Sequence, residues 1–118
     1  MRIHADAKVD KLARTDMFGA RSKRSLREVA SLADELEVPE GTQLTVQGEQ
    51  GREVFVLVDG AAEVRQDGEL LRELGPGEVI GERAVLAGGP RTATVTTTEP
   101  SRVLVLTDRD FRRVAPRA

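Results

Sequence analysis

Hydrophobic residues at helical spacing mark two segments near the N-terminus. From Val9 to Phe18 the apolar positions recur every three or four residues, and Gly19 then breaks the pattern. A longer stripe runs from about Lys23 to Leu36, and Ser22 is placed to cap its first turn. The apolar positions of this second stripe are Leu26, Val29, Ala30, Ala33 and Leu36. We expect two helices within residues 1–36, the second packed on the sheet that follows.

The hydrophobic period changes to two after residue 41, which is typical of strands. In residues 42–47 one face carries Thr42, Leu44 and Val46, and the other carries Gln43, Thr45 and Gln47. Residues 54–58 are apolar on both faces, as in a strand buried inside a closed roll. Asp59-Gly60 and Asp67-Gly68 lie between apolar runs and predict two tight hairpins.

Further strands are predicted at 92–98 and 102–106, joined by a turn at Glu99-Pro100. Asp108 can cap a last short helix, 109–114. The expected fold is mainly β with flanking helices: an eight-stranded antiparallel β-roll, jelly-roll-like, with N-terminal helices, one short internal helix and a short C-terminal helix. We expect one domain, 1–118, with the roll at 37–108 and a C-terminal helix stub at 109–118.

Composition narrows the function classes. With 118 residues, 39% of them hydrophobic and 32% charged, and a net charge of -2, the chain fits one soluble domain without a basic footprint for nucleic acid. The absence of cysteine excludes thiolate zinc sites and cysteine nucleophiles, and His4 alone cannot build the histidine metal site of a cupin-type enzyme. No apolar stretch is long enough to cross a bilayer, so we expect a cytoplasmic protein without a membrane partner. Four arginines near the C-terminus are expected to form a solvated helix face: Arg109, Arg112, Arg113 and Arg117.

The stretch from Gly77 to Val95 is irregular and carries the candidate chemistry. It interrupts two strands with a glycine-bounded, helix-competent insert, 83–87. Arg91 supplies a planar cationic fork that suits a phosphate, and Gly81 leaves backbone amides approachable. The carboxylate of Glu82 would instead favour a hydrogen-bond donor such as a ribose hydroxyl. A ligand that combines a phosphate with a sugar hydroxyl satisfies both side chains.

This stretch resembles the phosphate-binding cassette of the cyclic-nucleotide-binding domains of the catabolite activator protein, protein kinase A regulatory subunits and cyclic-nucleotide-gated channels. The matching residues are Gly81-Glu82-Arg83-Ala84-Val85 and Pro90-Arg91-Thr92-Ala93-Thr94-Val95, at the kinase-type spacing. The likeness extends to Pro39-Glu40-Gly41-Thr42, Gly48-Glu49 and Val58-Asp59-Gly60, and covers about residues 22–111. The chain resembles a stand-alone, bacterial-like member of this family, with the cassette at 77–95.

The resemblance implies a role for each candidate ligand-binding residue. Arg91 would pair with the cyclic phosphate, and Glu82 would accept a hydrogen bond from the ribose 2′-hydroxyl. The backbone at Gly81, Ala84 and Ala93 would line the ligand. Two further members of the set are Arg83 and Thr92.

Thr92 stands where domains similar to the cGMP-dependent kinases have a threonine that can bond the guanine amino group. Threonine also occurs in domains that use cAMP, so either base is possible and cAMP is slightly favoured. Arg83 stands where the family usually has leucine, and it either points to solvent or adds a second cation near the phosphate.

The implied function is a regulatory sensor that binds cAMP or cGMP and acts on a partner protein or through self-association, without catalysis, cofactor, metal or direct contact with nucleic acid. Two alternatives are a nucleotide-free interaction scaffold and the sensor fragment of a longer transcription regulator. Family members continue into a long helix that closes over the base, whereas this sequence ends at Ala118. We therefore expect an open pocket, a lid from another subunit, or a fragment.

Overall fold

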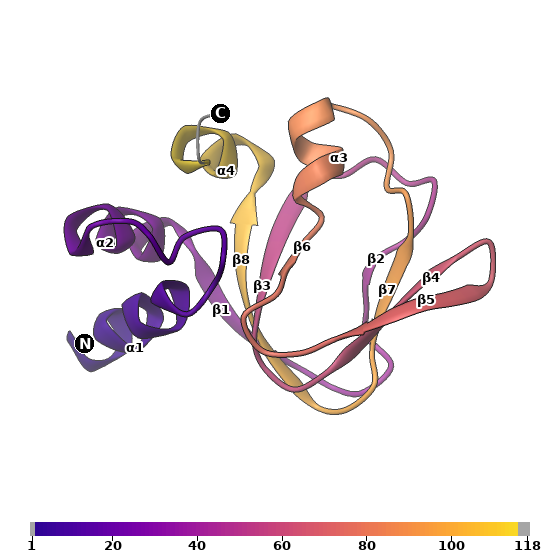
Figure 1. Ribbon diagram of the computed structural model, residues 1–118, viewed down its shortest axis with the longest axis horizontal. Helices are drawn as coiled ribbons and strands as arrows, with labels where there is room; N and C mark the ends of the chain where they lie inside the picture. The colour runs from indigo at the N-terminus through magenta and orange to yellow at the C-terminus, as the bar shows by residue number, and fades with distance from the viewer. Residues whose placement is uncertain (1, 116–118) are drawn as a thin grey trace.

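Two four-stranded antiparallel sheets form the body of the protein. The computed structural model describes the backbone of residues 2–115 and the side chains of residues 7–115. Within that range, one sheet has the order β1 (Asp34–Val38), β8 (Ser101–Thr107), β3 (Glu53–Asp59) and β6 (Val79–Ile80). The other has the order β2 (Gln43–Thr45), β7 (Thr94–Thr97), β4 (Ala62–Gln66) and β5 (Glu69–Leu74). The predicted fold class is confirmed (Figure 1).

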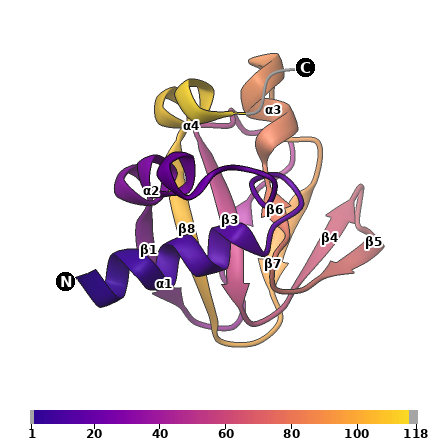
Figure 2. The ribbon, with the colours of Figure 1, turned by 60° about the vertical axis from the view of Figure 1, so that its left-hand side comes forward.

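Three helices cover the outer face of the first sheet, and a fourth interrupts the roll. The covering helices are α1 (Arg2–Ala13), α2 (Lys23–Leu32) and α4 (Asp108–Val114), whereas α3 (Glu82–Ala87) follows β6 (Figure 2). No described helix is both long and apolar enough to span a bilayer.

The core has two parts, one on each side of the first sheet. On the helix side, Val54 and Val56 pack with Val29 of α2. On the other side, Phe55 and Leu57 pack between the two sheets. The five residues 54–58 of β3 are all buried, as their unbroken apolar run predicted. Because β3 is held from both faces, the segments attached to its ends are firmly positioned.

The first helix differs from its predicted range. It begins at Arg2 and ends at Ala13, whereas the spacing predicted a helix from Val9 to Phe18. The Thr15 hydroxyl donates to the carbonyl oxygen of Leu12 (2.7 Å) and accepts from the amide of Phe18 (3.0 Å). These local hydrogen bonds replace helical ones, so the chain turns and brings Phe18 into the core.

The second helix is capped by Ser22 as predicted, since the Ser22 hydroxyl accepts from the amide of Ser25 (3.2 Å). It ends at Leu32, and the expectation that it continues to Leu36 is wrong. Residues 34–38 pair instead with β8, where Leu36 lies opposite Val103 and stays 49% exposed. Backbone pairing with β8 is therefore favoured over the helix that the spacing of the apolar residues predicted.

The two Asp-Gly turns behave differently. Asp67-Gly68, with φ of 53° and 83°, closes the β4–β5 hairpin as predicted. Asp59-Gly60 does not close a hairpin, because β3 and β4 belong to different sheets. Gly60 has φ of 105°, and a Cβ there would lie 2.1 Å from the Ser101 hydroxyl oxygen, so this tight turn carries the chain from one sheet to the other.

The last helix is capped by Thr107 rather than by the predicted Asp108. The Thr107 hydroxyl accepts from the amide of Asp110 (3.1 Å), and Asp108 is the first helical residue. Arg112 differs from a purely solvated side chain, because its guanidinium donates to the Val85 carbonyl oxygen of α3 (2.7 Å). Arg109 and Arg113 are exposed as expected, and His4 and Arg117 lie outside the described side chains.

Candidate functional site

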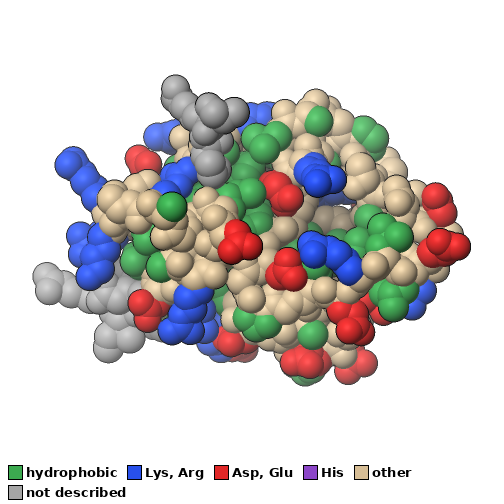
Figure 3. Space-filling model, in the orientation of Figure 1, with side chains coloured by type: hydrophobic (Ala, Val, Ile, Leu, Met, Phe, Trp, Pro, Cys, Tyr) green, Lys and Arg blue, Asp and Glu red, His purple; other side chains and the backbone are tan. Residues whose placement is uncertain are grey.

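A hollow of about 670 Å³ opens between the β4–β5 hairpin, β6, α3 and the loop before β7. Its volume lies within the range of roughly 300–1,000 Å³ usual for small-molecule sites. Its lining includes every residue that the sequence singled out: Gly81, Glu82, Arg83, Ala84, Arg91, Thr92 and Ala93. Figure 3 shows charged and hydrophobic side chains around an opening in this part of the molecule.

Arg91 is the buried cation of this hollow, with 7% of its surface exposed. Its Nη1 donates to the Gly81 carbonyl oxygen (3.0 Å) and its Nη2 to the Glu53 carbonyl oxygen (2.6 Å). Its own amide donates to the Glu49 carbonyl oxygen (2.8 Å). These bonds fix the guanidinium before a ligand arrives, and three of its five N–H donors do not take part in the two side-chain bonds.

Burial disfavours the charged form of Arg91 and lowers the pKa of its guanidinium. The carboxylates of Glu53 and Glu82 oppose this shift. Among the described residues Arg91 forms no ion pair, and an arginine stays protonated at neutral pH. The hollow therefore holds a poorly hydrated positive charge, which attracts an anion more strongly than an arginine in bulk water does.

Glu82 is the first residue of α3, and one of its carboxylate oxygens lacks a partner. Its Oε2 is buried and receives no hydrogen bond from any described group. A buried acceptor without a donor costs about 1–3 kcal/mol. A ligand hydroxyl in the hollow would remove this cost, as expected for the ribose hydroxyl that the resemblance implies.

Both the backbone conformation and the space at position 81 require glycine. Its φ of +90° favours glycine, and a Cβ there would lie 2.3 Å from Arg91 Nη1. The glycine therefore allows the sharp turn from β6 into α3 and leaves room for the guanidinium beside it.

The remaining predicted residues are spread around the hollow. Ala84 is buried, and the Ala93 carbonyl oxygen accepts from the Thr45 hydroxyl (3.0 Å). Thr92 and Arg83 are exposed, although both line the hollow. Arg83 is exposed at the rim of the hollow, and its approach to a bound phosphate stays a prediction.

The opposite wall comes from β4 and β5, which the sequence did not mark as part of the site. Val64 pairs with Arg72 and Arg65 with Leu70, so Leu71 is left as a β-bulge. The bulge lets the consecutive residues Leu71 and Arg72 both line the hollow. The adjacent leucines at 70 and 71 break the alternation of β5 and were the available signal for this bulge.

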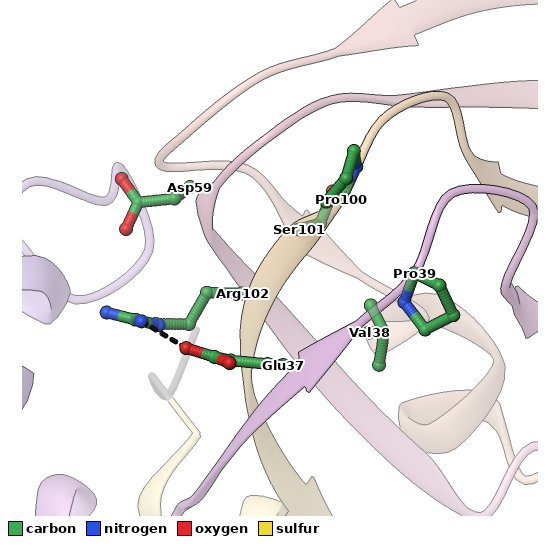
Figure 4. A pocket seen from close by; sticks show the side chains of 7 residues that line it. All are labelled: Glu37, Val38, Pro39, Asp59, Pro100, Ser101 and Arg102. Carbon is green, nitrogen blue, oxygen red and sulfur yellow. Dashed lines mark hydrogen bonds and ion pairs between the residues drawn. The ribbon is translucent and has the colours of Figure 1, made fainter.

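A second hollow of about 490 Å³ lies near the start of β8, and Figure 4 shows it from close by. Its charged side chains are already in ion pairs, Arg102 with Glu37 and Glu35 and Asp59 with Lys11, although Arg102 Nε is buried without a hydrogen bond to any described group. The part of the chain that the structure describes contains no group of three side chains suited to a metal ion. The first hollow therefore remains the candidate site.

Comparison with known families identifies the family to which this fold belongs. The family model described as cyclic nucleotide-binding domain matches residues 35–117. The chain belongs to the cyclic nucleotide-binding domain family. The matched range includes the whole of the first hollow, so the cassette resemblance and the family assignment rest on the same part of this domain.

Curated relatives of this cyclic nucleotide-binding domain include cAMP-dependent protein kinase regulatory subunits of two fungi. The Yarrowia lipolytica protein is 31% identical over 98 residues, covering 83% of this chain and 26% of its own length. The Mycosarcoma maydis protein is 38% identical over 102 residues, covering 76% and 19%. The Pycsar effector protein XpPycTIR of Xanthomonas perforans is 29% identical, covering 81% and 32%. The chain spans about a fifth to a third of the length of these relatives.

Solved structures share the fold. The regulatory domain of Toxoplasma gondii PKA with cAMP has a TM-score of 0.88 at 24% identity, covering 98% of this chain and 46% of that chain. The regulatory subunit of a cAMP-independent protein kinase A from Trypanosoma brucei has a TM-score of 0.90 at 19% identity, covering 98% and 43%. Because the fold occurs in a domain solved with cAMP and in a regulatory subunit of a cAMP-independent kinase, the fold by itself does not determine which ligand binds.

Proposed function

We propose that the hollow binds a 3′,5′-cyclic nucleotide, cAMP ahead of cGMP, and that binding regulates a partner protein or a second copy of the chain. The observation that carries the proposal is the pairing in one hollow of a buried arginine with a buried carboxylate oxygen that lacks a donor. A phosphate matches the first and a ribose hydroxyl the second. The proposed role is regulatory binding, not catalysis.

The same observation argues against a scaffold that has lost its nucleotide. A buried arginine and an unpartnered buried carboxylate oxygen both cost free energy in the folded state. A fold without a ligand gains nothing from keeping them together, whereas a binding site regains this cost on occupancy. Relatives named as cAMP-dependent regulators support cAMP as the first ligand.

A second candidate ligand, cGMP, is favoured by the wall opposite the cassette. Arg72 lines the hollow and is held near Glu78 by an ion pair of 3.4 Å. An arginine fork matches the O6 and N7 acceptors of guanine, whereas adenine presents a donor at the corresponding exocyclic position. Thr92 lines the same hollow and could bond the guanine amino group.

The signal has a structural route out of the site. Val85 follows Ala84 in α3, and its carbonyl oxygen accepts from Arg112 of α4. Arg21 in turn donates to the Val114 carbonyl oxygen at the end of α4. A ligand-induced movement of α3 would therefore reach α4 and the start of α2, where a partner could detect it.

Isothermal titration of the wild-type chain with cAMP and cGMP in parallel tests the proposal. We expect saturable 1:1 binding, with cAMP the tighter ligand. Arg91→Ala should weaken binding at least tenfold, because losing one partner of a buried charged contact costs about 2–5 kcal/mol. Arg109→Ala, an exposed arginine on α4 outside the hollow, is the matched control and should bind like wild type. Equal binding by the Arg91 variant, or none by the wild type, would contradict the proposal.

A further inference from the structure

Gly51 lies just before β3, is buried, and faces the guanidinium of Arg91 on the side where a Cβ would stand. A Cβ at this position would lie 3.2 Å from Arg91 Cζ, Arg91 Nη1 and the Cβ of Ala84. These distances are shorter than ordinary van der Waals contacts between carbon atoms. A side chain at Gly51 would therefore press on two parts of the site at once.

The requirement for glycine here is one of space. Gly51 is not among the glycines with positive φ, so its backbone is open to any residue. Gly48 shows the opposite case, since its φ is +87° and nothing lies within 4 Å of an added Cβ. Position 48 favours glycine because of its positive φ, whereas position 51 favours glycine because a side chain would crowd Arg91.

The guanidinium is confined by a second glycine as well. A Cβ on Gly81 would lie 2.3 Å from Nη1, and the carbonyl oxygens of Gly81 and Glu53 hold Nη1 and Nη2. The guanidinium of Arg91 thus occupies space that Gly51 and Gly81 leave free. Two backbone carbonyl oxygens orient it there.

We propose that Gly51 is a positioning residue for Arg91, which sets where the guanidinium meets the phosphate. This inference rests on the proposed function. An added methyl group would displace the fork or Ala84 of α3 by a few tenths of an ångström. Both groups line the ligand hollow, and a displacement of this size is comparable to the tolerance of about 0.5 Å for placing binding groups.

Gly51→Ala tests the proposal by titration with cAMP and cGMP. We expect binding of both nucleotides to weaken by about threefold to tenfold and in equal proportion, because both carry the same cyclic phosphate. Gly75→Ala is the matched control: it makes the same chemical change at a glycine without positive φ, with nothing within 4 Å and outside the hollow. The control should bind both nucleotides like wild type.

A double-mutant cycle with Arg91→Lys separates positioning from general packing. The lysine ammonium lacks the planar fork that lies beside Gly51, so Gly51→Ala should cause a smaller loss of affinity in that background, limited to what its contact with Ala84 causes. Any drop in melting temperature caused by Gly51→Ala should also be smaller there, which keeps the test informative for a destabilised variant.

The outcomes distinguish this inference from the proposed function. If the wild type binds neither nucleotide, the proposed function fails and the positioning role fails with it. If the wild type binds and Gly51→Ala binds equally well, the inference alone is overturned. A loss that persists in full with Arg91→Lys shows general packing and also overturns it.

Discussion

Arg91 and Glu82 face the same hollow, yet their polar groups are satisfied to different degrees. The guanidinium of Arg91 is already oriented by two carbonyl oxygens, whereas Glu82 Oε2 has no donor among the described groups. A cation that is fixed in advance loses little entropy when the phosphate arrives. The carboxylate gains its first good partner only when a hydroxyl is delivered, so it contributes to recognition of the sugar.

Glu82→Ala should therefore weaken cAMP binding by about tenfold, the equivalent of roughly 1.4 kcal/mol and close to the value of a hydrogen bond to a charged group. The same substitution should have little effect on 2′-deoxy-cAMP, which lacks the hydroxyl. Competition titration with both ligands measures the difference. Equal losses for the two ligands would show that Glu82 does not contact the 2′-hydroxyl.

At the residue scale, the sequence predicted the cassette side of the hollow and missed the rest. Gly81, Glu82 and Arg91 lie in one stretch of the chain, where glycine, charge and spacing are visible together. Gly51 and Arg72 come from distant segments, and no local pattern shows that they reach the same place. The Glu53 contact uses a backbone carbonyl, which any residue type supplies.

At the scale of elements, the hydrogen bond described between α3 and α4 comes from one arginine. Arg112 lies in the last turn of α4, and its guanidinium crosses to the Val85 carbonyl oxygen of the cassette helix. The buried Val85 of α3 also belongs to the helix-side core, together with Phe111 and Val114 of α4.

Arg112→Ala should lower the free energy of unfolding by about 1 kcal/mol, the usual value of a partly buried hydrogen bond. Urea unfolding of the ligand-free chain measures this loss. If the contact also transmits occupancy, hydrogen exchange in α4 should respond to cAMP in the wild type and not in the variant. An unchanged response in the variant would show that α4 is coupled to the site by another route.

Element boundaries were predicted best where one local interaction sets them. Ser22 and Asp67-Gly68 act through their own neighbours, so the start of α2 and the β4–β5 hairpin agree with prediction. Leu36 and Asp59-Gly60 are decided by pairing with strands far along the chain. The helical spacing that ended in Leu36 could not show that β8 offers this segment an edge.

At the scale of the whole molecule, positive charge is concentrated outside the roll. Residues 34–99 contain fourteen acidic and five basic side chains, whereas the flanking segments are net basic. Figure 3 shows Lys and Arg gathered over α1 and α2 on the left, and Asp and Glu over the roll. An anionic ligand must therefore be attracted locally, by Arg72, Arg83 and Arg91 of the hollow.

Ligand binding should stabilise the entire fold, because the hollow joins segments from both sheets. At a cAMP concentration of about one hundred times Kd, the added stability is about 2.7 kcal/mol. For a chain of this size the melting temperature should rise by roughly 10 °C, and that of Arg91→Ala should rise far less at the same concentration. Differential scanning calorimetry measures both, and equal rises would place the ligand away from Arg91.

A crystal structure of the chain with cAMP shows directly where the ligand sits. We predict phosphate oxygens within about 3 Å of the Arg91 guanidinium and the ribose 2′-hydroxyl at the same distance from Glu82 Oε2. The base should lie toward Leu71 and Arg72 on the opposite wall. A nucleotide bound in the hollow beside Arg102, or with its phosphate turned away from Arg91, would contradict the assignment of the cassette as the binding site.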